Sequence, residues 1–243
     1  LMIRRPPRST LDRWSAASDV YKRQPDFAVA SLDSIYKSNH DLCGVVTTPD
    51  KKAGRGQKMK ESAVKRYCIS NCIKLLQPVA FNDKVFINKL KSFRADIFVV
   101  VAFKILPKII WEIPSKGTIN IHASLLPQLR GAAPINWAII NGLRKTGLTS
   151  FYINEGIDTG DIIYQKRVDI ESKYATEVYQ QIYDSFQIDI LNIDFYKKGQ
   201  VQQNIVSATR KFFKEDFNIQ ELTIQNAKTK IRAFDFLGPA FLK

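Results

Sequence analysis

The sequence lacks any apolar run long enough to cross a membrane. Its longest apolar stretch, residues 97–103, has the length of a strand, whereas a membrane-spanning helix needs about 20 apolar residues. Neither a G-x-G-x-x-G turn nor a phosphate-binding G-x-x-x-x-G-K motif is present, so a dinucleotide or nucleoside triphosphate site has no support. Internal repeats and low-complexity tracts are also missing. These absences favour an ordinary globular domain.

Cysteine and histidine are scarce. The 243 residues include three cysteines and two histidines, and an odd, small number of cysteines argues against a disulfide framework and for a reducing compartment. Cys68 and Cys72 are four residues apart, which is the spacing of one helical turn, but neither histidine lies near them in the sequence. We interpret them as partly buried helix residues and expect no metal site.

Positive charge is abundant. The formal net charge is +14 and the sequence pI is about 9.7, which favours a polyanionic partner such as RNA. The alternative is a set of solvated lysines with no partner, because composition carries no geometry.

Residues 1–24 show no pattern typical of a folded domain. They hold six cationic and two anionic side chains and no apolar stretch for a signal peptide. Asp12 and Asp19 do not fit a mitochondrial transit peptide, and the stretch resembles translated sequencing-adapter sequence. We therefore interpret residues 1–24 as foreign or unstructured and exclude them from the expected fold.

Strand-like and helix-like stretches alternate through the rest of the chain. This alternation predicts an α/β fold, Rossmann-like, with a mostly parallel sheet and helices on both faces. Ligands of such sheets bind at the carboxyl ends of the strands. We expect strands at residues 42–47, 96–102, 117–122, 149–154 and 162–168, and helices at residues 61–76, 134–141 and 175–197.

Three polar residues can carry acyl-transfer chemistry. Asn120 and His122 are two residues apart at a predicted strand end, so their side chains should share one face. An amide donor can bind a developing oxyanion, and an imidazole can move a proton. Asp158 lies in a loop flanked by glycines and could orient the imidazole; without it, a polar strand end would be the simpler interpretation. No covalent nucleophile is apparent, because Ser124 lacks a G-x-S-x-G context.

Longer motifs surround these residues. They read Asn-Ile-His-Ala-Ser-Leu-Leu-Pro at 120–127, Arg-Gly-Ala-Ala-Pro-Ile-Asn-Trp at 130–137 and Gly-Ile-Asp-Thr-Gly-Asp at 156–161. Together they resemble the signature of the 10-formyltetrahydrofolate-dependent formyltransferases, and the second motif is similar to the methionyl-tRNA branch and its sugar-nucleotide relatives. The stretch 47–56 resembles a strand-to-loop insertion of the same family. The resemblance covers residues 25–200 strongly and 201–243 loosely.

The resemblance implies a role for each matching residue. Asn120, His122 and Asp158 would be catalytic. The formyl donor would be 10-formyltetrahydrofolate, with no metal, and the acceptor would be initiator methionyl-tRNA. The residues implied to line the folate site are Ser124, Leu125, Leu126, Pro127, Phe103 and Ile105. The residues implied to contact tRNA are Arg55, Lys51, Lys52 and Lys58, for which a solvated basic loop is the alternative.

The same resemblance predicts the domain organisation. Residues 25–200 would be the catalytic domain, and residues 201–243 a linker with the start of a C-terminal barrel that is largely absent. We expect a cytoplasmic bacterial enzyme, monomeric and away from membranes, rather than a mitochondrial one. Three alternatives stay open: a sugar-nucleotide N-formyltransferase, a truncated fragment without activity, and a non-catalytic RNA-binding domain with the same fold.

Overall fold

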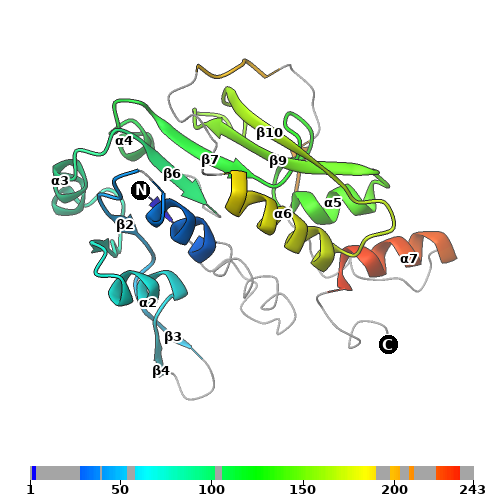
Figure 1. The fold of residues 1–243 in the computed structure, drawn as a ribbon, viewed down its shortest axis with the longest axis horizontal. Helices are drawn as coiled ribbons and strands as arrows, with labels where there is room; N and C mark the ends of the chain where they lie inside the picture. The colour runs from blue at the N-terminus through cyan, green and yellow to red at the C-terminus, as the bar shows by residue number, and fades with distance from the viewer. Residues whose placement is uncertain are drawn as a thin grey trace. The chain divides into compact units, whose positions relative to one another are not determined.

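The structure of the chain is a computed structural model. The described residues are 2–3, 28–38, 40–53, 58–101, 106–189, 198–202, 208–210 and 223–235. The chain divides into two compact units, and strands alternate with helices along it (Figure 1). The first unit takes in Leu1–Thr10, Tyr21–Ile121 and Gln187–Tyr196, and the second takes in Leu11–Val20, His122–Phe186 and Lys197–Lys243.

The first unit is built on a parallel sheet. Its neighbouring strands, in order across the sheet, are β7 (Thr118–His122), β6 (Phe98–Val101), β1 (Met2–Ile3), β2 (Val45–Val46) and β5 (Leu75–Leu76). All four residues of β6 are buried, as expected for a β-branched strand covered on both faces. The predicted α/β class with a mostly parallel sheet is therefore confirmed.

Strand β1 differs from the prediction made for residues 1–24. Met2 pairs with Val46 and Val100, and Ile3 pairs with Val101, so β1 lies between β2 and β6. Two of the residues that we left out of the expected fold thus pair in the sheet, because an extended backbone of any sequence can form hydrogen bonds with both neighbouring strands. Residues 4–24 lie outside the described residues.

Helices α2 (Ala63–Ser70) and α3 (Lys84–Ser92) of the first unit begin with polar capping residues. Ser62 accepts a hydrogen bond from the backbone of Lys65 at the start of α2, and Asp83 accepts one from Val85 at the start of α3. Leu32 and Cys68 belong to a buried cluster formed by the helix over residues 28–36, α2 and β2. A short helix of the same unit, α4 (Lys108–Trp111), begins after Pro107.

The helix predicted over residues 61–76 is shorter than expected. It ends at Ser70, and Cys72 then takes a left-handed conformation with φ of 54°. The backbone N–H of Ile73 donates to the carbonyl of Cys68 at 2.9 Å, which closes the helix end without the glycine usually found there. The chain continues into strand β5, so Cys72 is exposed beyond the helix instead of lying on it.

In its described residues, the second unit contains an antiparallel hairpin, three helices and a two-stranded parallel pair. The hairpin strands are β9 (Lys145–Tyr152) and β10 (Ile162–Asp169), and the pair is β8 (Arg130–Gly131) with β11 (Ala208–Thr209). The helices are α5 (Pro134–Ile140), α6 (Ala175–Asp189) and α7 (Ile224–Ala233). The strand and helix types predicted here are confirmed, although β9 begins four residues before the predicted start.

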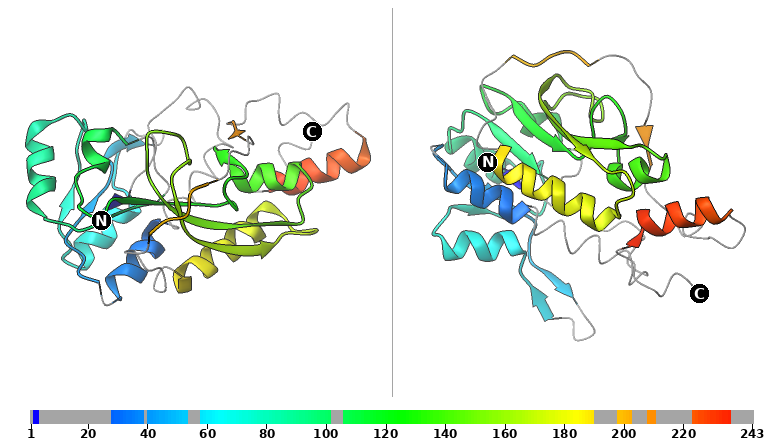
Figure 2. Two further views of the ribbon diagram at one scale, coloured as in Figure 1. Left: turned by 90° about the horizontal axis from the view of Figure 1, so that it is seen from above. Right: turned by 45° about the vertical axis from the view of Figure 1, so that its right-hand side comes forward.

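Helix α7 packs against α5 within the second unit (Figure 2). The buried side chain of Asn136 donates to the carbonyl of Ala233 at 2.5 Å. Asp235, two residues after the end of α7, caps the start of helix α6. Its carboxylate accepts a hydrogen bond from the backbone N–H of Thr176 at 3.2 Å. The α7 segment, which we predicted to be a linker, therefore also supports this unit.

Candidate active site

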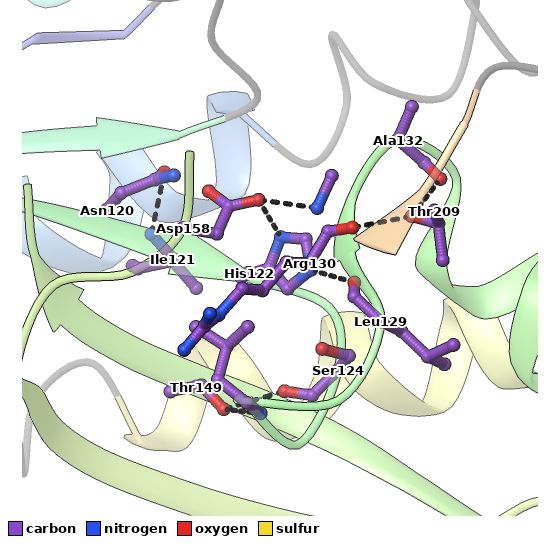
Figure 3. A network of polar contacts seen from close by, with 12 residues as sticks. Asn120, Ile121, His122, Ser124, Leu129, Arg130, Ala132, Thr149, Asp158 and Thr209 are labelled. Carbon is purple, nitrogen blue, oxygen red and sulfur yellow. Dashed lines mark hydrogen bonds and ion pairs between the residues drawn. The ribbon is translucent and has the colours of Figure 1, made fainter. Parts of the chain in front are cut away.

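The carboxyl end of β7 carries the first two predicted catalytic residues. Asn120 is half-buried and His122, the last residue of the strand, is 7% exposed. The side-chain oxygen of Asn120 accepts a hydrogen bond from the backbone N–H of Ile121 at 2.8 Å (Figure 3). Among the described residues, no acceptor lies within hydrogen-bonding distance of the Asn120 amide nitrogen, which carries two donor hydrogens.

The ring of His122 lies between two oxygen acceptors in the second unit. Its Nε2 is 2.8 Å from the carbonyl oxygen of Leu129, and its Nδ1 is 3.5 Å from Oδ2 of Asp158. A carbonyl oxygen only accepts, so Nε2 must carry a hydrogen. A second hydrogen, on Nδ1, would point at the Asp158 carboxylate. Asp158 and His122 thus lie close together, as predicted, and the Nδ1 edge of the ring faces the carboxylate.

Asp158 is held by its backbone conformation and by its carboxylate. Its φ is 53°, in the left-handed region that aspartate tolerates better than most side chains. Oδ2 accepts a hydrogen bond from the backbone N–H of Gly131 at 2.8 Å. Its side chain is 14% exposed, so few water molecules compete for the carboxylate.

Glycines and an asparagine shape the loop that carries Asp158. The side-chain oxygen of Asn154 accepts hydrogen bonds from the backbone of Gly156 and from the hydroxyl of Thr159. A Cβ placed on Gly160 would lie 1.6 Å from the carbonyl oxygen of Tyr152, so no larger residue fits at that position without a shift.

The segment predicted to line the folate site is tied to the β9–β10 hairpin. Thr149 donates to the carbonyl of Ser124 at 2.7 Å and accepts from the backbone N–H of Leu126 at 3.1 Å. Gln165 donates to the carbonyl of Leu126 at 2.7 Å. Ser124 and Leu126 are buried, whereas Leu125 and Pro127 are half-buried. Direct contact with a ligand is therefore easier for Leu125 and Pro127.

The predicted tRNA contacts lie on or beside a β-hairpin of the first unit. Strands β3 (Lys51–Ala53) and β4 (Lys58–Lys60) pair in antiparallel fashion, with Lys51 opposite Lys60. We had expected a loop here. Arg55 lies outside the described residues, as do Phe103 and Ile105 of the predicted pterin wall.

A polar cluster closes the base of this hairpin. The Lys65 ammonium group lies 2.5 Å from Oδ2 of Asp50 and 2.8 Å from Glu61, and Gln77 donates to Oδ1 of Asp50 at 3.0 Å. The hydrogen bond from Lys65 and then that from Gln77 lower the pKa of the Asp50 carboxyl below its ordinary value. The same bond, with a second from Glu61, raises the pKa of Lys65.

Sequence reasoning missed Gln202 and Thr209. Gln202 contacts both Arg130 and the Asp158 loop, and the single hydroxyl hydrogen of Thr209 is shared between the carbonyls of Arg130 and Ala132. No local motif marks either residue, and both follow a predicted domain boundary near residue 200. In the described part of the chain, no group of three histidine, cysteine or acidic side chains gathers to hold a metal, and no helix is long and apolar enough to cross a membrane.

Residues 20–191 match the protein family described as formyl transferase. The chain is 54% identical over 152 residues to the methionyl-tRNA formyltransferase of Flavobacterium johnsoniae, covering 63% of this chain and 48% of that protein. It is also 54% identical over 153 residues to the methionyl-tRNA formyltransferase of Clostridioides difficile, covering 63% and 50%. The chain thus spans about half the length of the curated relatives that it matches.

Solved structures share the fold. A glycinamide ribonucleotide transformylase from Symbiobacterium toebii aligns with a TM-score of 0.61 at 14% identity, over 83% of this chain and 92% of that one. An N-formyltransferase from Helicobacter canadensis, in complex with folinic acid and dTDP-3-aminofucose, aligns with a TM-score of 0.60 at 23% identity, over 96% and 79%. At these identities the likeness extends to the fold alone.

Proposed function

This chain belongs to the formyl transferase family, and we propose that it transfers the formyl group of 10-formyltetrahydrofolate to the α-amine of methionyl initiator tRNA in translation initiation. The relatives at 54% identity, which are named methionyl-tRNA formyltransferases, support this choice of acceptor. Those relatives are bacterial, so a bacterial cytoplasmic site of action, without membrane attachment, is part of the proposal, as is a monomeric state.

One observation supports the chemistry above all others. The buried ring of His122 is held between the Leu129 carbonyl and the Asp158 carboxylate, two residues after an asparagine whose amide N–H groups have no acceptor among the described residues. An oriented imidazole–carboxylate pair can move protons, and a free amide donor can bind an oxyanion. Direct transfer needs both and does not need a covalent nucleophile.

The proposed reaction proceeds through one tetrahedral intermediate. The α-amine of methionine attacks the formyl carbon, and the electrons of the C=O double bond move to oxygen. Asn120 donates to this oxyanion. When the carbonyl re-forms, the bond from the formyl carbon to N10 breaks, and a proton from the amine passes to N10. His122 and Asp158 carry that proton, so the net products are the formylated amine and tetrahydrofolate.

The geometry refines the role proposed for His122. An oxyanion contact from His122 as well as from Asn120 would need a ring N–H that points away from the protein, but both ring nitrogens face protein oxygens. The proposal therefore gives the main oxyanion contact to Asn120. The hydrogen on Nε2 is used by the Leu129 carbonyl, so Nδ1 is the ring atom that can take up the amine proton and release it to N10. Nδ1 lies 3.5 Å from Asp158, which is longer than a normal hydrogen bond.

The substrate contacts are proposed on the same basis. Half-buried Leu125 and Pro127 would touch the folate, while buried Ser124 and Leu126 would hold the segment in place. Phe103 and Ile105 would complete the folate wall. The cations of the hairpin region, Lys51, Lys52, Arg55 and Lys58, would attract the tRNA phosphates.

A formyl-transfer assay with charged initiator tRNA tests the proposal. We expect His122→Ala to lower kcat/KM by about 10²–10⁴-fold, because a positioned acid–base group contributes roughly that factor. Asn120→Ala should lose about 10²–10³-fold, the usual effect of removing an oxyanion donor. His40→Ala is the matched control, because His40 is the other histidine and is exposed. Wild-type turnover in His122→Ala would refute the assignment.

The same assay separates the proposed acceptor from the alternative. A sugar-nucleotide N-formyltransferase would use an identical site on a different amine. Transfer to a dTDP-linked amino sugar but not to methionyl-tRNA would overturn the acceptor and leave the chemistry standing. Transfer to neither amine by the folded protein would overturn the proposed activity of this chain.

A further inference from the structure

We propose that Gln202 is a positioning residue for the reaction, because it fixes the loop that presents Asp158 to His122. Its side chain is only 8% exposed, although glutamine is mostly found at the surface. Residue 202 lies beyond residues 20–191, which match the family. The inference rests on the proposed function for its kinetic consequences, but its structural part does not depend on any substrate.

Gln202 uses all of its hydrogen-bonding capacity. Its oxygen accepts from Nε and Nη2 of Arg130 at 3.1 and 2.8 Å, and its nitrogen donates to the carbonyls of Asp158 and Gly160 at 3.1 and 2.7 Å. A primary amide has two donor hydrogens and two acceptor lone pairs, so all four are satisfied. Turning the amide over would oppose donors to donors and acceptors to acceptors, so the amide orientation is unique.

These bonds hold Asp158 from a second side. The backbone N–H of Gly131 donates to the Asp158 carboxylate, while Gln202 holds the Asp158 carbonyl. Arg130 and Gly131 are consecutive in β8, so one short strand supplies both connections. The carboxylate of Asp158 is therefore held directly by Gly131, and its backbone is held by Arg130 through Gln202.

Strand β8 is itself fixed by Thr209 in β11. The Thr209 hydroxyl oxygen lies 2.9 and 2.8 Å from the carbonyl oxygens of Arg130 and Ala132, which share its one hydrogen. A Cβ on Gly131 would lie 2.5 Å from the Thr209 carbonyl oxygen, and Gly131 has φ of 103°, so only glycine suits this contact. Gln202 and Thr209 therefore act on the site through β8 and the Asp158 loop, without providing a group that reacts.

The His122–Asp158 pair, 3.5 Å apart, depends on the bonds by which Gln202 holds the Asp158 loop. The pair is longer than a direct hydrogen bond, so a small displacement of the loop weakens it further. Misplacement of a catalytic group by about 1 Å can lower a rate by roughly 10²-fold. Loss of the Gln202 bonds should therefore reduce kcat more than it raises KM, since no proposed substrate contact changes.

The test compares Gln202→Met, which keeps the length and removes all four bonds, with Gln200→Met, whose side chain is exposed. The chain has two histidines, His40 and His122, so NMR resolves the ring nitrogens of each. We expect the His122 nitrogen signals to move in Gln202→Met alone and kcat for formyl transfer to fall about 10–100-fold with KM nearly unchanged. Wild-type His122 signals in the folded Gln202→Met protein would overturn the inference.

A second variant keeps the inference testable if Gln202→Met does not fold. Gln202→Glu retains the acceptor toward Arg130 but cannot donate to the two loop carbonyls. It should shift the His122 signals and lower kcat, and wild-type signals would again overturn the role of the loop bonds. If wild-type protein transfers no formyl group at all, the proposed function fails, while the ring signals still decide the role of Gln202.

Discussion

Single residues of this protein gain their roles from the atoms around them. His122 and His40 are the same residue type, but His122 is buried between the Leu129 carbonyl and the Asp158 carboxylate, whereas His40 is exposed. Asn120 differs from a structural asparagine because only its oxygen is used within the described residues. The sequence indicated all three catalytic candidates, since each lies in a motif. It could not indicate that both ring nitrogens of His122 face protein oxygens.

The cysteines give a residue-scale prediction about reactivity. Cys68 is fully buried, and burial raises the pKa of its thiol to about 11. At pH 8 only about one Cys68 in a thousand is then a thiolate, the reactive form. We expect Ellman's reagent to modify exposed Cys72 quickly and to reach Cys68 only on unfolding. Peptide mapping after a short reaction checks this, with Cys72→Ser as control; rapid labelling of Cys68 in folded protein would contradict it.

At the scale of elements, loops and hairpins are held by a few polar bonds at their bases. The β3–β4 hairpin is closed by Lys65, Asp50 and Gln77, and the Asp158 loop is closed by Asn154 and Gln202. Sequence periodicity predicted the strands and helices next to these elements but gave the hairpin as a loop. Three-residue strands carry too short a pattern for period-2 alternation to be recognised.

The Asp50 carboxylate should contribute stability that depends on pH. Hydrogen bonds from Lys65 and Gln77 lower its pKa in the folded state, so its contribution is present above the unfolded pKa of about 4 and is lost as pH falls through the folded value. We expect the free energy of unfolding to fall more steeply below about pH 4 in wild type than in Asp50→Asn. Urea denaturation across this range measures it. Exposed Asp41→Asn should keep the wild-type slope, and equal slopes in all three proteins would contradict the prediction.

Gly160 gives a second element-scale prediction. Its missing Cβ makes room for the Tyr152 carbonyl, so Gly160→Ala should destabilise the protein by about 1–3 kcal/mol, as overpacking does. Because Gly160 is two residues from Asp158, formyl transfer should fall as well. Gly142→Ala serves as control, since its left-handed backbone is strained by alanine but no atom lies within 4 Å of the added Cβ. Thermal unfolding and activity are measured for both. Loss of activity in the Gly142 variant alone would contradict this account.

For the molecule as a whole, charge should govern encounter with RNA. The net charge of +14 and the four cations proposed to contact tRNA predict salt-sensitive binding. With about four phosphate contacts, affinity for initiator tRNA should fall roughly 50- to 150-fold between 50 and 200 mM salt. Fluorescence anisotropy at several salt concentrations measures the slope. Substituting alanine for Lys51, Lys52 and Lys58 should flatten it, and an unchanged slope would exclude the hairpin region as the phosphate contact.

The sequence alone was sufficient for the α/β class and the order of most elements, because these depend on local periodicity. Contiguous motifs were enough to propose Asn120, His122 and Asp158 as catalytic candidates. The sequence led us to exclude Met2 and Ile3, which pair in the sheet, and to extend a helix beyond Ser70, where Cys72 takes a left-handed conformation. Only the tertiary structure brought Gln202 and Thr209 to the site. Their contacts join residues 42 to 79 positions apart, and hydrogen bonds over such separations leave no periodic trace in the chain.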